Sequence, residues 1–290
     1  MSLPEGFLPR IFFILEEYWG SFMSGVGNTM LIAVVSTFIG CIIGFLVGMI
    51  QTIPTDKEEN PVKFYFMLIV KFILNAYVEI FRGTPMMVQA MFIYYGSSMV
   101  FGIDLGMYQA AFLIVSINTG AYMAETVRGG ILSIDPGQTE GAMAIGMNHW
   151  QTMMSVILPQ ALRNIMPQIG NNLIINIKDT CVLSVIGMME LFYTTKGIAG
   201  AYYTYFEAFS ITMVLYFILT FTCSRILRYI EMRMDGPDNY ELVMSDALTM
   251  GEGTYRMPNK EKDTNADLRA HKQSEASKNA LNHGSQRGNL

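Results

Sequence analysis

Long apolar runs set the strongest limit on what this chain can fold into. They lie at Phe22–Ile50, Phe64–Phe81, Met86–Phe101, Tyr108–Gly130, Leu173–Phe192 and Phe206–Leu227. A hydrocarbon layer of ~30 Å requires about 20 helical residues at ~1.5 Å per residue, and most of these runs approach or exceed that length. This excludes an ordinary cytosolic enzyme. We therefore predict an all-α polytopic membrane protein with about five transmembrane helices.

The distribution of charge supports this fold class and sets the domain limits. Of the 290 residues, 51% are apolar and 15% are charged, whereas soluble domains have about 25% charged residues. The last 56 residues hold nine acidic and seven basic side chains, so the rest of the chain is more apolar than the mean suggests. We predict an N-terminal segment at 1–20, a transmembrane domain at 21–233 and a disordered cytoplasmic tail at 234–290.

Basic residues near the span ends indicate the orientation, because cytoplasmic loops are rich in lysine and arginine. One side carries all of Arg82, Arg128, Arg163, Arg225, Arg228 and Arg233. We place that side in the cytoplasm, together with residues 131–168 and the C-terminus. The expected extracellular loops, 102–106 and about 193–203, carry only Asp104 and Lys196. Residues 64–101 leave two possibilities open, a pair of spans with a sharp turn at Arg82 or a first piece lying partly in the interface.

Small residues in the first apolar run indicate close helix packing. Gly40, Gly44 and Gly48 recur every four residues and share one face of a helix. Such a stripe allows the backbone of a second helix to approach. The cysteines Cys41, Cys181 and Cys223 lie in apolar stretches without metal-ligand spacing, so we expect packing roles and no metal site.

Residues 135–159 predict two short helices on the cytoplasmic side. Asp135 followed by Pro136 is typical of a helix start, Gly146 permits a break, and Asn148 is a second candidate cap. Pro159 is expected to close the unit. An amphipathic helix pair between two spans can present an apolar ridge to a soluble partner and transmit motion to the spans. The alternative is a helix that lies on the membrane surface.

Polar side chains within spans are costly and are therefore candidates for function. In the fourth span a stripe contains Asn172, Asn176, Asp179, Thr180 and Ser184, and Lys178 lies about 100° away. In the third span Asn118, Tyr122, Glu125 and Thr126 share a stripe, and Arg128 is within reach of Glu125. We expect the two stripes to face each other across a substrate pathway formed by Asn118, Glu125, Asn176, Lys178, Asp179, Thr180 and Ser184. The alternative is that these residues hold the bundle together. Arg82 and Glu79 are interpreted as structural.

Several motifs in this order resemble the membrane permease subunits of ABC importers of the polar amino acid (histidine, glutamine and arginine) type. The cytoplasmic signature of that family, Glu-Ala-Ala followed by Gly and Ile-x-Leu-Pro, corresponds to Glu140-Gly141-Ala142, Gly146 and Ile157-Leu158-Pro159. Further motifs lie at Tyr77–Pro85, Gly120–Ile131, Pro159–Arg163 and Lys178–Thr180. Two departures are Gly141, in place of the first alanine, and Cys181, where the family has serine after Lys-Asp-Thr.

This resemblance implies a division of labour. A second permease subunit, identical or related, completes the pathway, and an extracellular or periplasmic solute-binding protein delivers a polar amino acid. Separate ATPase subunits, which bind ATP and Mg, dock on residues 138–157, and the coupling residues are Glu140, Gly141, Ala142, Gly146, Ile157 and Pro159. The chain has no Gly-x-x-x-x-Gly-Lys-Ser/Thr motif, so we expect no ATP hydrolysis by this subunit and no catalytic residue. The runner-up is an ion-coupled secondary amino acid transporter. An intramembrane enzyme is disfavoured because no histidine lies within a span.

Overall fold

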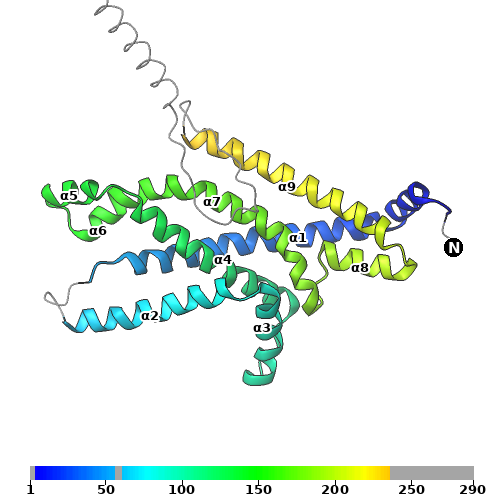
Figure 1. The fold of residues 1–290 in the computed structure, drawn as a ribbon, viewed down its shortest axis with the longest axis horizontal. Helices are drawn as coiled ribbons and strands as arrows, with labels where there is room; N and C mark the ends of the chain where they lie inside the picture. The colour runs from blue at the N-terminus through cyan, green and yellow to red at the C-terminus, as the bar shows by residue number, and fades with distance from the viewer. Residues whose placement is uncertain (1–3, 56–60, 236–290) are drawn as a thin grey trace, which may run out of the picture. The chain divides into compact units, whose positions relative to one another are not determined.

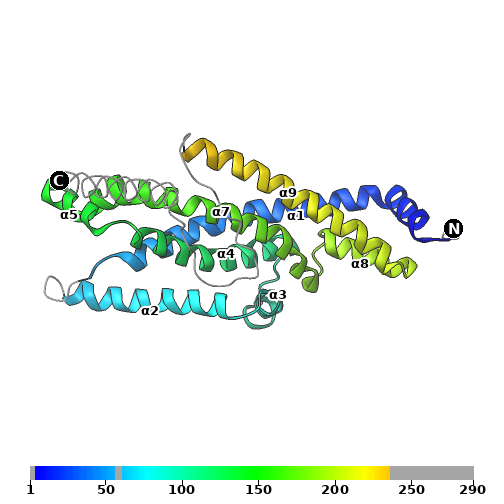
Figure 2. The ribbon, with the colours of Figure 1, turned by 45° about the horizontal axis from the view of Figure 1, so that its top comes forward.

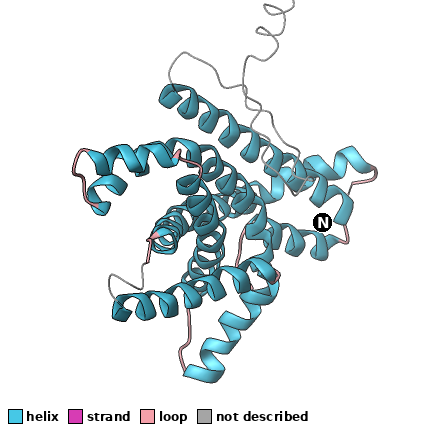
Figure 3. Cartoon of the chain, turned by 60° about the vertical axis from the view of Figure 1, so that its left-hand side comes forward, coloured by secondary structure: helices cyan, strands magenta, loops and turns pink. Residues whose placement is uncertain are grey.

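The structure is a computed structural model that describes residues 4–55 and 61–235, and every regular element in them is a helix (Figures 1 and 3). The predicted tail at 234–290 lies outside the described residues except for the last two residues of α9. In chain order the elements are α1 (Phe7–Thr52), α2 (Pro61–Gly83), α3 (Met86–Phe101), α4 (Met107–Leu132), α5 (Pro136–Ala144), α6 (His149–Thr152), a π-helical turn η1 (Met153–Ile157), α7 (Leu158–Asp179), a 3-10 segment η2 (Thr180–Ile186), α8 (Leu191–Tyr202) and α9 (Tyr205–Asp235).

The number of membrane spans agrees with the sequence. By length and apolar composition, α1, α2, α4 and α9 are each able to cross a membrane, and residues His149–Ile186 together with α8 form a bent fifth candidate. This confirms the all-α fold with about five spans. In the ambiguous region, α2 and α3 are separate helices with Pro85 just before α3. The 16 residues of α3 extend only about 24 Å, which is less than the ~30 Å core.

The N-terminal segment is also helical. α1 extends over 46 residues, and Tyr18 interrupts it with non-helical backbone angles. The piece up to Tyr18 contacts the end of α8 and the first turn of α9. Arg10 Nη1 lies 3.3 Å from Glu207 Oε1, and the hydroxyl of Tyr18 donates to that of Tyr202 at 3.0 Å. Residues 7–17 are therefore an ordered part of the helical unit and precede the first span.

The packing of α1 against α4 forms the centre of the helical unit, and the predicted glycine stripe lies at this contact. A Cβ atom on Gly40 would lie 2.7 Å from Thr119 Cβ, and one on Gly48 would lie 2.7 Å from the carbonyl oxygen of Ala124. Only glycine allows the two backbones to come this close. The prediction that this stripe serves close helix packing is confirmed.

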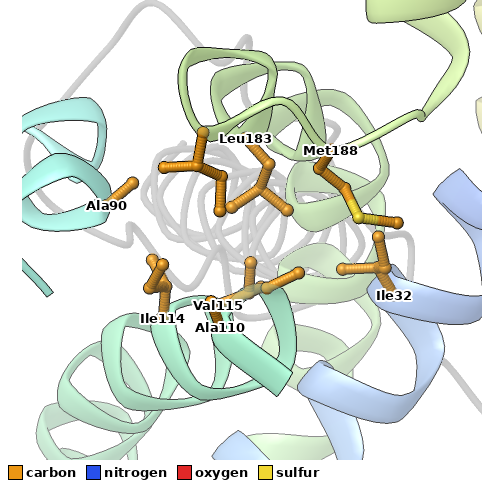
Figure 4. Packing of buried hydrophobic residues seen from close by; sticks show 9 residues of the cluster. Ile32, Ala90, Ala110, Ile114, Val115, Leu183 and Met188 are labelled. Atoms are coloured by element: carbon orange, nitrogen blue, oxygen red, sulfur yellow. The ribbon is translucent and has the colours of Figure 1, made fainter. Parts of the chain in front are cut away.

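Two apolar clusters extend this contact in both directions. At one end, an apolar cluster joins α1 and α4 to the region after α7, through Ile32, Ile114, Leu183 and Met188 (Figure 4). Ala90 of α3 lies at the side of this cluster. Toward the other end Met123, Val127 and Ile165 join α4 to α7. Views in Figures 1 and 2 agree that α5 and α8 lie at opposite ends of the helical unit. The α1–α4 pair therefore connects the α5–α6 end with the α8 end.

The predicted continuous span at Leu173–Phe192 is wrong. The α-helix ends at Asp179, tightens to a 3-10 helix through Ile186, and turns at Gly187, which has a φ of 84°. α8 then leaves at an angle of 55°, so residues expected as an extracellular loop, about 193–203, are mainly helix. The helix ends here because of Gly187 itself, since glycine readily adopts the left-handed φ that terminates a helix. The apolar run continues on both sides of this glycine.

Replacement of Gly44 by alanine tests the close contact. A Cβ atom there would lie 2.8 Å from the carbonyl carbon of Met123 and 2.9 Å from the backbone nitrogen of Ala124. We expect Gly44→Ala to lower the free energy of unfolding by about 1–3 kcal/mol, because backbone atoms cannot move aside. The measurement is thermal unfolding of the purified protein in detergent micelles.

Gly27→Ala is the matched control on the same helix. A Cβ atom at Gly27 meets nothing within 4 Å, and alanine favours a helix over glycine by up to ~1 kcal/mol. We expect this variant to unfold no earlier than the wild type. Equal destabilisation by both substitutions would contradict the assignment of a close contact to Gly44.

Candidate functional site

A buried hydrogen-bond network joins three helices at Asn176. The side-chain amide of Asn176 on α7 donates to Thr37 Oγ1 of α1 at 2.7 Å and to Thr119 Oγ1 of α4 at 2.9 Å. All three residues are at most 5% exposed. Buried polar groups in a membrane bundle require such partners, and this network fixes the relative positions of α1, α4 and α7.

The polar stripe of α4 faces a different pair of helices. Asn118 Nδ2 donates to the carbonyl oxygen of Phe81 at 3.2 Å and to Gln89 Oε1 at 3.0 Å. The buried Gln89 also donates to the Phe81 carbonyl at 2.9 Å and to the Thr84 carbonyl at 2.9 Å. Asn118 and Gln89 therefore provide partners for backbone groups that are left open where α2 ends and α3 begins.

Glu125 forms an ion pair with Arg82 at the end of α2. The Arg82 guanidinium also lies over the ring of Tyr122, 5.5 Å from its centroid. The side chains of Arg82 and Glu125 are 39% and 48% exposed, so the pair lies at the surface of the helical unit. Arg82, interpreted from the sequence as structural, contacts a residue that was assigned to the pathway.

The expectation that the two polar stripes face each other is therefore wrong within this chain. Asn118 and Glu125 point toward α2 and α3, whereas the α4 side chains that hydrogen-bond with α7 are Thr119 and Met123. The sulfur of Met123 lies 3.1 Å from Asn172 Nδ2. Neighbouring residues on a helix lie about 100° apart, so a stripe beginning at Asn118 does not share its face with Thr119. The sequence pattern identified polar faces without indicating which helix each one meets.

The polar residues of α7 and η2 divide into a buried and an exposed set. Asn176 and Thr180 are buried, and the Thr180 hydroxyl donates to the Ile177 carbonyl at 3.0 Å. Lys178 and Asp179 are exposed at the point where the α-helix changes to the 3-10 helix, and Ser184 is half-buried in that segment. Among these residues, Lys178 and Asp179 are the two that a solute outside the helical unit could contact directly.

The turn between η2 and α8 is organised by Glu190, a residue that the sequence analysis missed. Glu190 is fully buried, and its carboxylate accepts hydrogen bonds from the backbone N–H groups of Phe192 at 2.8 Å and Tyr193 at 2.7 Å. It also accepts from the Tyr216 hydroxyl of α9 at 3.0 Å. The position of an acidic residue directly before an apolar helical run is the signal that could have identified this N-cap.

The same turn is attached to α1. The backbone N–H of Leu191 donates to the hydroxyl of the buried Thr29, and Asn28 donates to the Met189 carbonyl at 2.7 Å. The Tyr108 hydroxyl of α4 donates to Asn28 Oδ1 at 2.9 Å. An open groove lies beside this turn, and its lining includes Ser24, Asn28, Tyr108 and Met189. The break in the fifth span is thus held in place by α1, α4 and α9.

The two predicted short helices are present, and each begins at its predicted cap. Asp135 caps α5 by accepting from the Gly137 N–H at 2.7 Å, and Asn148 caps α6 by accepting from the Gln151 N–H at 2.9 Å. Gly146 lies between them with a φ of 88°. The expectation that Pro159 closes the unit is wrong, because α7 begins at Leu158 and continues through this proline.

The π-helical turn explains how the helix passes Pro159. The N–H of Leu158 donates to the Met153 carbonyl, five residues back. Proline has no N–H and its ring crowds the carbonyl four residues earlier, and a wider turn relieves this conflict. Gln160 Nε2 also donates to the Val156 carbonyl at 2.9 Å. α6 is therefore continuous, through η1, with α7 of the broken span.

The predicted coupling residues occupy two different positions. Ala142 and Ile157 are buried, and Ile157 packs beneath α4 with Val127 and Ile131. Glu140, Gly141, Gly146 and Pro159 are exposed. Large apolar side chains accompany them at the surface, namely Met143 at 48%, Ile145 at 78%, Trp150 at 66% and Met154 at 41% exposed. We call Met143, Ile145, Trp150 and Met154 the apolar ridge.

Within residues 4–55 and 61–235, no group of three or more histidine, cysteine, aspartate or glutamate side chains is arranged to hold a metal ion. Among the described residues, the cysteines Cys41, Cys181 and Cys223 are free thiols. The candidate functional features of the described residues are therefore the exposed Lys178 and Asp179 on α7 and the apolar ridge.

Comparisons with known proteins agree on one family. Residues 62–236 match the family described as binding-protein-dependent transport system inner membrane component. The chain is 37% identical over 213 residues to the glutamine transport system permease protein GlnP of Escherichia coli (strain K12), covering 73% of this chain and 92% of that protein. It is 33% identical over 231 residues to the arginine transport system permease protein ArtQ of Bacillus subtilis (strain 168), covering 80% and 96%.

Solved structures show the same fold. A crystal structure of an amino acid ABC transporter with histidines superposes with a TM-score of 0.67 at 33% identity, covering 79% of this chain and 99% of that one. The MetNI methionine ABC transporter in an inward-facing conformation superposes with a TM-score of 0.62 at 24% identity, covering 75% and 98%. The second similarity concerns the fold alone.

Replacement of Glu190 by alanine tests the turn before α8. We expect Glu190→Ala to lower the free energy of unfolding by at least ~2 kcal/mol, because an unpaired buried donor costs about 1–3 kcal/mol and loss of a helix cap about 0.5–2 kcal/mol. Thermal unfolding in detergent is the measurement, and Glu16→Ala, at an exposed position on α1, is the control. If Glu190→Ala and Glu16→Ala both unfold at the same temperature as the wild type, Glu190 does not fix the turn.

Proposed function

This chain belongs to the family of binding-protein-dependent transport system inner membrane components, and from that premise we propose that it is the membrane-spanning subunit of an ATP-driven importer for a polar amino acid. The names of its relatives support an amino acid as the solute. Five candidate spans with a bent fifth span are consistent with a subunit that forms a pathway across the inner membrane.

One observation carries the proposed coupling to an ATPase. The apolar ridge is exposed on α5, on α6 and on the residue or turn that directly follows each of them. These elements lie between α4 and α7 in the chain, at the end of the helical unit that carries α5 (Figure 1). Exposed apolar side chains of this size on a helix pair are suited to a groove in a soluble protein. We assign this surface to a separate ATPase subunit that binds ATP and Mg.

The helix geometry supplies a route for motion from the ridge to the pathway. The buried Ala142 and Ile157 anchor the helix pair beneath the spans, and the backbone continues through the π turn into α7. A displacement of α5 and α6 would move α7 as a body, up to the break at Gly187. Rigid-body movement about such a break is a common means of gating in transporters.

The charge distribution supports the orientation that we propose. When the spans are followed in chain order, three arginines fall on the same side as α5 and α6, namely Arg163, Arg225 and Arg228. Basic residues near span ends favour the cytoplasm. Residues 131–168 and the C-terminus are then cytoplasmic, and the α8 end faces outward. A second permease subunit, identical or related, and an extracellular or periplasmic solute-binding protein complete the transporter. No observation favours the ion-coupled alternative.

The substrate contact that we propose is Asp179 together with Lys178. Both side chains are exposed where α7 changes to a 3-10 helix, and transporters often bind solutes where a membrane helix is discontinuous. Asp179 suits the ammonium group of an amino acid, and Lys178 suits its carboxylate. Asn118, Asn176 and Thr180 act as bundle contacts in this proposal, and Glu125 is paired with Arg82.

Replacement of Ile145 by aspartate tests the ridge. We expect Ile145→Asp to abolish co-purification of the ATPase subunit and ATP-dependent uptake, because a charge at this contact would be buried without a partner. Leu132→Asp is the control, since Leu132 is also a large exposed apolar residue, at 65%, but lies outside residues 138–157. Retention of the ATPase by Ile145→Asp, or its equal loss in the control, would contradict the assignment.

Replacement of Asp179 by asparagine tests the substrate contact. We expect Asp179→Asn to reduce amino acid uptake in proteoliposomes by about 10–100-fold, since a hydrogen bond to a charged group is worth about 1.5–3 kcal/mol. Co-purification of the ATPase should be unchanged, and Asp179→Glu should restore part of the uptake. Glu16→Gln is the control for loss of an exposed acid. Normal uptake by Asp179→Asn would refute the contact without refuting the coupling.

A further inference from the structure

The last helix has one packed face and one exposed face along its whole described length. Ile211, Leu215 and Leu219 of α9 pack against the N-terminal half of α1 and against α8. On the other face Met213, Phe217 and Phe221 are between 48% and 70% exposed. A membrane-spanning helix with exposed apolar side chains on one face presents that face to lipid.

The exposed face changes character near Arg225. Counted from Tyr205, the ~20 residues that cross the hydrocarbon core end at about Ser224. Beyond this point, Arg225, Tyr229 and Arg233 continue the exposed face at four-residue intervals, directly after Phe221. We call Phe221, Arg225, Tyr229 and Arg233 the arginine–aromatic stripe. It lies where the end of α9 meets the headgroup layer.

Each arginine of the stripe lies over the aromatic ring one turn before it. The Arg225 guanidinium is 4.9 Å from the centroid of Phe221, and the Arg233 guanidinium is 5.2 Å from that of Tyr229. Side chains on a helix point back toward its N-terminus, so both guanidinium groups fold toward the membrane. The rings restrict the conformations of the arginine side chains, so that less side-chain entropy is lost when a ligand binds them.

Tyr229 adds a donor of its own to this surface. Its oxygen accepts hydrogen bonds from Arg233 Nε at 3.1 Å and Arg233 Nη2 at 2.6 Å. The hydroxyl group keeps its hydrogen for donation to a further acceptor. A guanidinium and a phenol hydrogen that converge at the headgroup layer form a set of donors suited to an anionic oxygen.

We propose that the arginine–aromatic stripe of α9 is a binding site for the phosphate of an anionic phospholipid headgroup. Arg233 and Tyr229 contact the phosphate, and Arg225 adds positive charge at the edge of the core. The occupant is a lipid because the stripe continues an apolar face and ends at the depth of the phosphates. Positive charge near a membrane surface contributes about 1 kcal/mol per residue toward anionic lipids.

Arg228 provides a matched comparison on the same helix. It lies three residues after Arg225 and is half-buried, whereas Arg225, Tyr229 and Arg233 are exposed. Arg228→Gln removes the same charge as Arg233→Gln, at a position about 8 Å away along the helix axis. A purely non-specific attraction would respond equally to both substitutions, whereas a site at Arg233 would respond to one.

Native mass spectrometry of the full-length protein, titrated with phosphatidylglycerol or phosphatidylcholine in detergent, tests the proposal. We expect retention of phosphatidylglycerol with a higher affinity than phosphatidylcholine. Arg233→Gln should weaken phosphatidylglycerol binding by about tenfold, the effect of one charge-assisted hydrogen bond, and Tyr229→Phe should weaken it while keeping the ring. Arg228→Gln should bind as the wild type does.

Three outcomes would overturn the proposal. Equal affinity for phosphatidylglycerol and phosphatidylcholine would show that the protein does not recognise an anionic headgroup. Equal weakening by Arg228→Gln and Arg233→Gln would leave only general electrostatic attraction. A cross-link between two copies of the chain through cysteines placed at Arg225 and Tyr229 would show that a second subunit covers the stripe. Loss of folding is monitored by thermal unfolding of each variant.

Discussion

The hydrogen bonds of Asn176 are the interaction on which the rest of this structure depends. A buried amide meets Thr37 and Thr119, which lie on two helices far apart in the sequence, and the glycine stripe of α1 allows those helices to approach. In a membrane, where apolar burial does little to pull helices together, such contacts and close packing determine the arrangement. Movement of α7 relative to α1 and α4 would break this network.

The network lies within the part of the chain that we expect to move with α5 and α6, which extends to the break at Gly187. On one side of Asn176, α7 continues through the π turn to the apolar ridge. On the other side, the 3-10 segment leads to Gly187 and to α8. The start of α8 is held to α9 through Glu190 and to α1 through Thr29. The proposed substrate contact at Asp179 lies beside the network, where a change in α7 would alter it directly.

Local signals in the sequence predicted local structure well. The glycine stripe, the caps at Asp135 and Asn148 and the break at Gly146 each depend on neighbouring residues, and each is present. The break before α8 was missed because apolar composition continues across Gly187 and hides the turn. The partners of Asn118 and Asn176 could not be predicted, since they depend on how helices dozens of residues apart are rotated against one another.

Thiol accessibility at two consecutive residues tests the central claim, which is that α7 has a buried face joined to the bundle and an exposed face on the pathway. Asp179 is exposed and Thr180 is fully buried. In a protein whose three native cysteines are replaced by alanine, Asp179→Cys should react with a membrane-impermeant thiol reagent, and substrate should slow this reaction. Thr180→Cys should remain unreactive. Rapid, substrate-sensitive labelling of Thr180→Cys with no labelling of Asp179→Cys would contradict the account.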